Sequence, residues 1–128
     1  NNAGIAGHVI VGNNITIGAF TTIHQFCSIG DYSFIGMSTS ITMDIPAYVK
    51  VAANPARVIG LNSVGMSRNN ISAGSISLIK KTYKLVYRKG LKIDDAINKS
   101  KKLNEGVDDP FLNIFIQSLE VSERGILR

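Results

Sequence analysis

The sequence is poor in cysteine and has no long hydrophobic run, and each absence excludes a class of protein. Its single cysteine, Cys27, excludes an internal disulfide bond. No stretch comes near the roughly 18 consecutive apolar residues that a membrane-spanning helix needs. The chain does not open with a basic segment followed by an apolar run, so we expect no signal peptide. With a hydrophobic content of 45%, these features favour a globular protein of the cytoplasm.

Histidine and aromatic residues are also scarce, which limits the ligands to expect. The only histidines are His8 and His24, whereas a catalytic zinc ion needs three protein ligands, so we expect no metal and no cofactor. Aromatic residues make up 7% of the chain, and we do not expect nucleic acid as a partner. The net charge of +5 indicates a phosphate-bearing ligand or an acidic protein, unless it marks only a mildly basic surface.

The first third of the chain carries a strict repeat of six residues. The repeated aliphatic residues are Ile5, Val11, Ile17, Ile23, Ile29, Ile35 and Ile41. A strand would show a period of two and a helix a period of 3.6, so this spacing is typical of a parallel β-helix. Each hexapeptide predicts a strand and a corner, about three to a coil, with the aliphatic side chain inside and a following glycine free to adopt a positive φ. Cys27 falls on a second inward position, which favours a buried thiol over a reactive one.

The repeat also predicts where the two histidines lie. With about 18 residues to a coil, Phe26 is expected directly below His8, and His24 comes two residues earlier. Both histidines should therefore lie near one edge of neighbouring coils and outside the aliphatic positions. An outward histidine in a rigid coil can serve as a base or as a polar contact for a ligand. Position alone favours a surface histidine with local hydrogen bonds.

The pattern changes along the chain and predicts a mainly β fold with an α-helical tail. We expect the β-helix over residues 1–42, an irregular connection over 43–71 with a strand candidate at 48–52, and a helical domain over 72–128. Cap and stop residues predict three helices: Ser72 to near Gly90, residues 93–103, and Asp109 to about residue 123. This helical domain is expected to cap the lower end of the coil.

The start of the chain bears on its completeness. Residue 1 is Asn, the first methionine is Met37, and the repeat supplies only about two coils, whereas repeat proteins generally need about three units and a cap. We therefore expect this chain to be the C-terminal part of a longer protein whose earlier coils are missing.

Several runs resemble the bacterial UDP-N-acetylglucosamine acyltransferases of lipid A synthesis. The matching runs are residues 6–9, 22–27 with its His-Gln-Phe element, 44–49, 60–68, 83–88 and 124–128. Hexapeptides occur in many acyltransferases, but His-Gln-Phe joined to this tail is more specific. The resemblance implies a homotrimer of left-handed β-helices with active sites between subunits. It also implies transfer of a 3-hydroxyacyl group from acyl carrier protein to the 3-hydroxyl of UDP-N-acetylglucosamine, the first step of lipid A biosynthesis.

The resemblance also implies site residues. The backbone N–H of Gly7 matches the oxyanion contact, where a glycine lets the thioester approach, and His8 matches a supporting catalytic histidine. His24 and Gln25 match residues that bind the substrate. The family's general base, a histidine, would precede residue 1.

Three further residues carry expectations from the same resemblance. Asn62 and Arg68 match substrate-binding positions, although Asn69 stands where the family often has a second arginine. Met37 stands where a glycine in relatives leaves a long acyl groove, and its side chain would fill the floor of that groove. We therefore predict a short acyl chain of about ten carbons. The alternative is that Met37 packs in the core.

Two other functions stay open at this stage. One is the related N-acyltransferase that acts later in the pathway on UDP-3-O-acylglucosamine. The other, for this chain alone, is a non-catalytic module for trimerisation or for binding the carrier protein, because the expected base is absent.

Overall fold

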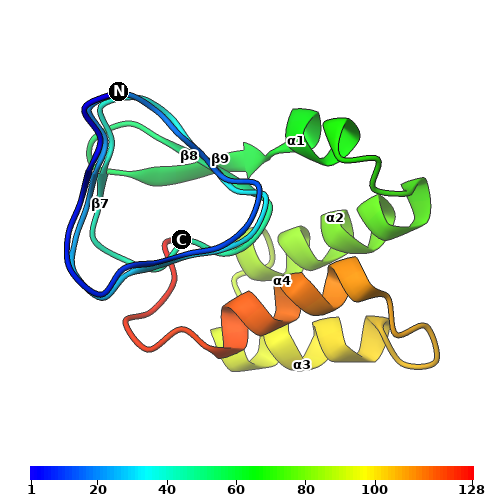
Figure 1. Ribbon diagram of the computed structural model, residues 1–128. Helices are drawn as coiled ribbons and strands as arrows, with labels where there is room; N and C mark the ends of the chain where they lie inside the picture. Colours follow the sequence, from blue (N-terminus) through cyan, green and yellow to red (C-terminus); the bar gives the residue numbers. More distant parts are fainter.

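A computed structural model describes all residues 1–128 and shows the parallel β-helix that the repeat predicts (Figure 1). Its seven short strands are β1 Gly4–Ile5, β2 Ile10–Val11, β3 Thr16–Ile17, β4 Thr22–Ile23, β5 Ser28–Ile29, β6 Phe34–Ile35 and β7 Ser40–Ile41. Strands three hexapeptides apart stack in parallel, so β1 pairs with β4 and β4 with β7. Three hexapeptides therefore close one triangular coil, as expected.

The repeated aliphatic residues fill the interior of the coil. Ile23, Ile35 and Ile41 are at most 2% exposed, whereas Ile5 of the first coil is 49% exposed because no coil covers it. Cys27 is fully buried, as predicted, and burial raises the pKa of its thiol, which disfavours the reactive thiolate.

The corners correct the role that we expected of the glycines. Positive φ angles fall three positions after each repeated aliphatic residue from Ile5 to Ile35, on non-glycine residues such as His8 (59°) and Phe26 (67°), and not on the glycines of the repeat. Those glycines are required for another reason. A Cβ at Gly18 would overlap the backbone of Met37 on the next coil, and one at Gly30 would overlap the backbone of Ala47. The repeat therefore selects glycine for the close approach of stacked backbones.

The segment 43–71 is more regular than predicted. It contains β8 Val49–Ala52, β9 Arg57–Leu61 and the short helix α1 Ser63–Arg68. The strand candidate at 48–52 is thus present as β8, which pairs in parallel with β6 and antiparallel with β9. The helix was missed because its six residues are too few to show a period. The division of the chain at residues 42 and 71 stays a prediction.

Three longer helices follow, namely α2 Ala73–Tyr87, α3 Ile93–Leu103 and α4 Pro110–Glu120. The side chain of Ser72 caps α2 by accepting from the Ser75 N–H, and that of Asp109 caps α4. The helices lie to one side of the coil (Figure 1), whereas we expected them across its lower end. None of them is both long enough and apolar enough to span a bilayer.

Buried contacts fix the helices against the coil. Tyr48 is fully buried, and its hydroxyl donates a hydrogen bond of 2.7 Å to the carbonyl of Phe111 in α4. The carboxylate of Asp44 accepts from the Ser28 N–H of β5 at 2.8 Å and from the Ser122 hydroxyl, just after α4, at 2.6 Å. These links hold α4 beside the outer face of β2 and β5, where a groove forms.

Candidate functional site

One corner of the coil brings together four of the residues implied in function. Gly7 and His8 form this corner on the first coil, and His24, Gln25 and Phe26 form it on the next. The His8 ring stacks on the Phe26 ring, with centroids 4.8 Å apart and planes at 4°, which confirms the expected alignment. The Phe26 N–H donates to the Gly7 carbonyl at 3.1 Å. The corner is therefore a rigid, stacked unit whose side chains point outward.

The polar groups of this corner are available to a ligand. The Gly7 N–H has no acceptor within the chain, and no atom lies within 4 Å of the position that a Cβ would take. His24 is exposed, and its Nδ1 lies 3.2 Å from the Gln25 carbonyl. Because a carbonyl can only accept, Nδ1 carries the proton in the neutral ring and Nε2 presents a lone pair. The corner thus offers one free backbone donor and one imidazole acceptor.

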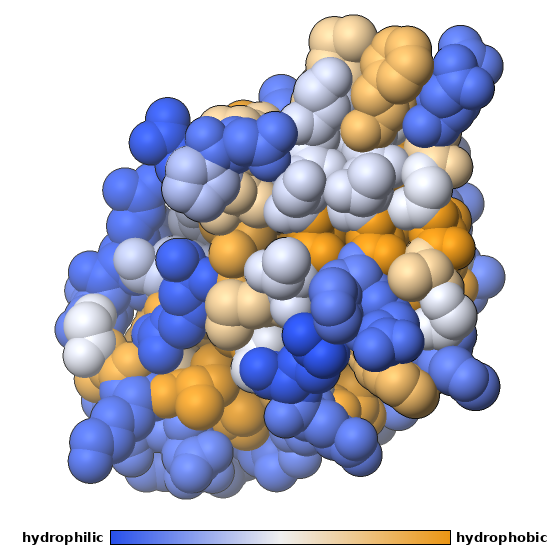
Figure 2. Space-filling view, turned by 90° about the vertical axis from the view of Figure 1, so that its left-hand side faces the viewer, coloured by the Kyte–Doolittle hydropathy of each residue, from blue (hydrophilic) through white to orange (hydrophobic).

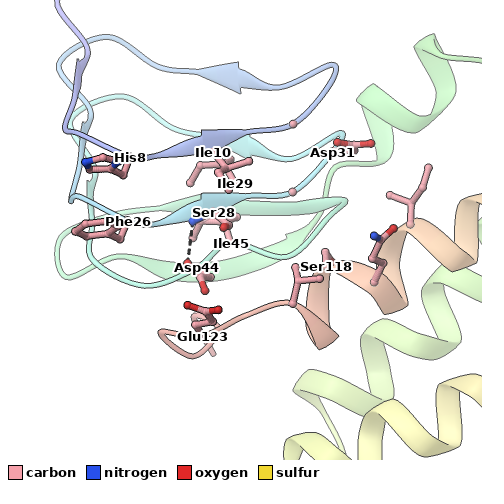
Figure 3. Close-up of a pocket in the computed structure, with 15 residues that line it drawn as sticks. His8, Ile10, Phe26, Ser28, Ile29, Asp31, Asp44, Ile45, Ser118 and Glu123 are labelled. Carbon is pink, nitrogen blue, oxygen red and sulfur yellow. Dashed lines mark hydrogen bonds between the residues drawn. The ribbon is translucent and has the colours of Figure 1, made fainter.

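A groove of about 560 Å³ begins at this corner and runs between the coil and α4 (Figure 3). His8 and Phe26 lie at one end and Asp31 at the other, with the outer face of β2 and β5 between them. The apolar lining comprises Ile10, Phe26, Ile29, Ile45, Ile114 and Val121. The helical side adds Gln117 and Ser118.

The groove carries negative charge and no cation. Its carboxylates are those of Asp31, Asp44 and Glu123, and no Lys or Arg lines it. Asp44 is 4% exposed and uses both oxygens within the chain, while Asp31 accepts from the Asn13 N–H at 2.8 Å. This lining suits an uncharged apolar or hydroxyl-bearing group and disfavours a phosphate.

Asn62 and Arg68 lie away from this corner within the single chain. Asn62 is 8% exposed, its Oδ1 accepts from the Gly65 N–H at 3.1 Å, and its Nδ2 donates to the Tyr32 carbonyl at 2.8 Å. It therefore caps α1 and ties that helix to the corner after β5. Arg68 is exposed in the last turn of α1 and makes no hydrogen bond or ion pair. A substrate contact by either residue stays a prediction.

Met37 occupies the corner after β6, and the structure does not bring it to the His8 corner within one chain. Its side chain is 66% exposed, which excludes the alternative that it packs in the core of this chain. Phe20, on the stacked corner after β3, is 59% exposed. Figure 2 shows hydrophobic side chains gathered in patches between hydrophilic ones on the side of β1, β4 and β7.

Sequence reasoning missed the other wall of the groove. Gln117 and Ser118 of α4 line it, and Ser118 accepts from the Ala47 N–H at 3.0 Å, 71 residues earlier in the chain. No periodic signal in the sequence connects such distant segments. No group of three or more His, Cys, Asp or Glu side chains comes together as a metal site.

Comparisons with known proteins give consistent matches. The family model described as UDP N-acetylglucosamine O-acyltransferase, domain 2, matches residues 44–127. A relative from Ectopseudomonas mendocina, an acyl-[acyl-carrier-protein]–UDP-N-acetylglucosamine O-acyltransferase, is 42% identical over all 128 residues, and the match covers 49% of that relative. The chain therefore spans about half the length of the curated relatives that it matches.

Solved structures agree with the fold. A UDP-N-acetylglucosamine O-acyltransferase from Moraxella catarrhalis superposes with a TM-score of 0.94 at 41% identity, covering 100% of this chain and 49% of the other. A related structure from Acinetobacter baumannii has a TM-score of 0.93 at 43% identity with the same coverage. These similarities confirm the left-handed β-helix with a helical tail.

Proposed function

Because this chain belongs to the UDP-N-acetylglucosamine O-acyltransferase family, we propose that it is part of an enzyme that transfers a 3-hydroxyacyl group from acyl carrier protein to the 3-hydroxyl of UDP-N-acetylglucosamine. This reaction would be the first step of lipid A assembly in the cytoplasm. The observation that carries the proposal is the match over all 128 residues, which joins the His8 corner to the helical tail. The relatives are named O-acyltransferases, which favours transfer to oxygen over the N-acyltransferase alternative.

In the proposed reaction the sugar 3-hydroxyl gives its proton to a general base as its oxygen attacks the thioester carbon, and the carbon–sulfur bond then breaks. The carrier thiolate leaves and takes up a proton. Negative charge develops on the carbonyl oxygen in the transition state, and a positioned backbone N–H stabilises such charge. The Gly7 N–H is unpaired and open, which supports this role. His8 would support the reacting groups, and Phe26 fixes the plane of its ring.

Substrate positioning is assigned to the neighbouring residues. The Nε2 atom of His24 would accept a hydrogen bond from a substrate hydroxyl, because its Nδ1–H donates to the Gln25 carbonyl. Gln25, exposed beside it, would add an amide contact to the acyl acceptor. Arg68 has no partner in the chain and would attract the diphosphate of UDP-N-acetylglucosamine. The diphosphate would not bind in the groove, because the carboxylates there repel it.

We also propose a homotrimer in which sites form between subunits. Phe20, Met37 and Ile10 are 59%, 66% and 68% exposed on the outside of the coil, and a neighbouring subunit would bury such surface. In this arrangement Met37 of one subunit would close the acyl groove of a site and select a short chain. The His8 corner and the Met37 corner are separate within one chain, which supports a site shared between subunits.

The test uses the native gene product that carries this chain. It is incubated with UDP-N-acetylglucosamine and a series of 3-hydroxyacyl carrier proteins, and the products are identified by mass spectrometry. An ester at the sugar 3-position supports the proposal. In a parallel incubation with UDP-3-O-acylglucosamine as the acceptor, an amide product would support the N-acyltransferase instead. Carrier-protein binding by a folded trimer without product from any donor would support the non-catalytic module.

A further inference from the structure

The net positive charge of the chain comes from one stretch. Between Asp44 and Asp94 there is no Asp or Glu, whereas the cations number nine: Lys50, Arg57, Arg68, Lys80, Lys81, Lys84, Arg88, Lys89 and Lys92. Before Asp44 the only charged side chain other than histidine is that of Asp31, and after Asp94 both signs are mixed. Helix α2 therefore carries cations without any acidic residue to balance them.

The cations of this helix share its exposed side. Helix α2 buries Ser75, Ile79, Thr82, Tyr83 and Val86, which recur at the spacing of one helical face. The opposite face presents Lys80, Lys81 and Lys84, all exposed, and Arg88 continues it at the C-cap. The remaining exposed residues of the helix are the small Ala73, Gly74 and Ser77. We call the four cations the α2 basic stripe.

This arrangement costs stability that no carboxylate in the chain offsets, and the only other partner of the stripe is the Tyr83 ring, whose centroid lies 5.8 Å from the Arg88 guanidinium. Lys80, Lys84 and Arg88 are spaced i, i+4, i+8, and like charges at this spacing destabilise a helix. None of the stripe pairs with a carboxylate, whereas Lys101 of α3 pairs with Glu120 at 3.0 Å. A run of like charges without a compensating carboxylate breaks a local rule, and such exceptions are expected at functional surfaces. An external anion would supply the missing compensation.

The geometry of the stripe selects the kind of anion. Lys80 to Arg88 spans eight residues, about 12 Å of helix, which is too long for one diphosphate. Ile79 and Val86 are fully buried, so the helix has no free apolar face to insert into a lipid surface. The stripe therefore suits a row of carboxylates on a folded protein.

We propose that the α2 basic stripe docks an acidic protein, and, resting on the proposed function, that this protein is the acyl carrier protein of the donor. Surface charges of this kind steer encounter and set salt dependence. The stripe holds the carrier by its protein surface, while the thioester reacts at the coil.

The experiment compares two charge-matched pairs in the native gene product. Lys80→Gln with Lys84→Gln removes two charges from the stripe, and Lys99→Gln with Lys102→Gln removes two exposed charges from α3. The stripe pair should raise the KM for the carrier-bound donor about fivefold at low salt, with kcat unchanged. Neither pair should alter transfer from the same acyl group on phosphopantetheine alone.

Direct binding separates the possible failures. Fluorescence anisotropy of labelled carrier protein should show the same loss of affinity for the stripe pair, and high salt should abolish the difference. Equal effects of both pairs, or none from the stripe pair, would overturn the docking surface. Stripe-dependent binding to phosphatidylglycerol vesicles with carrier binding intact would assign it to a lipid surface instead. If no donor is turned over, the proposed acyltransferase function is refuted. The anisotropy measurement still tests separately whether the α2 basic stripe binds the carrier protein.

Discussion

Asp109 joins two helices through its carboxylate, and we predict that its charge stabilises the helical domain in a pH-dependent way. Its Oδ1 accepts from the N–H groups of Phe111 and Leu112 at 3.0 Å each, and its Oδ2 accepts from the Ser75 hydroxyl of α2 at 2.6 Å. Burial alone would raise the pKa of Asp109, but these hydrogen bonds outweigh burial and lower it below its ordinary value.

The size of the effect follows from the bonds that each substitution removes. Asp109→Ala loses the cap of α4, about 1 kcal/mol, and the charge-assisted bond to Ser75, about 1.5 kcal/mol. We expect the free energy of unfolding to fall by about 2–3 kcal/mol. Asp109→Asn retains a capping oxygen and should cost only about 1 kcal/mol. Ser75→Ala removes the bond to Asp109 and the 3.0 Å bond accepted from the Ser72 hydroxyl, and it leaves the cap of α4 in place.

The sign of the pH dependence follows from the lowered pKa. The folded protein binds fewer protons at Asp109 than the unfolded chain, whose aspartate pKa is about 3.9. The contribution of the charge is fully present above that value and is lost as the pH falls through the folded pKa. The difference in stability between wild type and Asp109→Asn should therefore be largest near neutral pH and vanish in acid.

Urea unfolding of the native gene product, followed by circular dichroism from pH 7 downward, measures this difference. Ser75→Ala and Asp109→Asn should not add, because both remove the same bond. A gap that is constant with pH, or full additivity of the two substitutions, would refute the reasoning.

Three further predictions follow from single contacts. Gly18→Ala should destabilise the fold by about 3 kcal/mol, because the added Cβ forces the stacked coils apart. Gly74→Ala lies in open space on α2 and should stabilise the fold by about 0.5–1 kcal/mol. Thermal melts compare the two variants, and equal effects would contradict the argument that Gly18 is needed for the close approach of the coils. Tyr48→Phe should cost about 1–1.5 kcal/mol by removing the buried hydrogen bond from its hydroxyl to the Phe111 carbonyl, and an unchanged urea midpoint would contradict this. Met37→Gly should shift donor preference toward longer acyl chains by about 0.8 kcal/mol per methylene. An unchanged preference would refute the prediction that Met37 limits the length of the acyl chain.

The β-helix could be predicted from the sequence because its aliphatic residues recur every six positions. Each aliphatic residue meets its own equivalent on the next coil, so one period fixes the register, the interior and the stacking of His8 on Phe26. The same period could not say why glycine recurs. Positive φ and close backbone approach both select glycine, and only the stacked coils show that Gly18 serves the second purpose.

The groove could not be predicted, because contacts across long sequence separations create it. Tyr48 and Phe111 are 63 residues apart, and Asp44 and Ser122 are 78 apart. Neither pair shares a motif, and both depend on how α4 docks against the coil. Asn62 shows the converse limit. The resemblance marks it as a substrate contact, which stays a prediction, and no motif in the sequence indicates that its buried amide also caps α1 and donates to the Tyr32 carbonyl.

Charge and chemistry occupy different parts of this molecule, and that separation bears on how it would handle anionic substrates. The coil before Asp44 is almost without charge, and its groove adds carboxylates, so the His8 corner by itself does not attract phosphate. The cations begin only with β8 and reach their highest density over residues 80–92, from the second half of α2 to the start of α3. Long-range attraction sets the rate of encounter, whereas short-range contacts set the reaction geometry. The helical tail would therefore capture anionic partners, while the rigid corner, which has no Lys or Arg beside it, orients the groups that react.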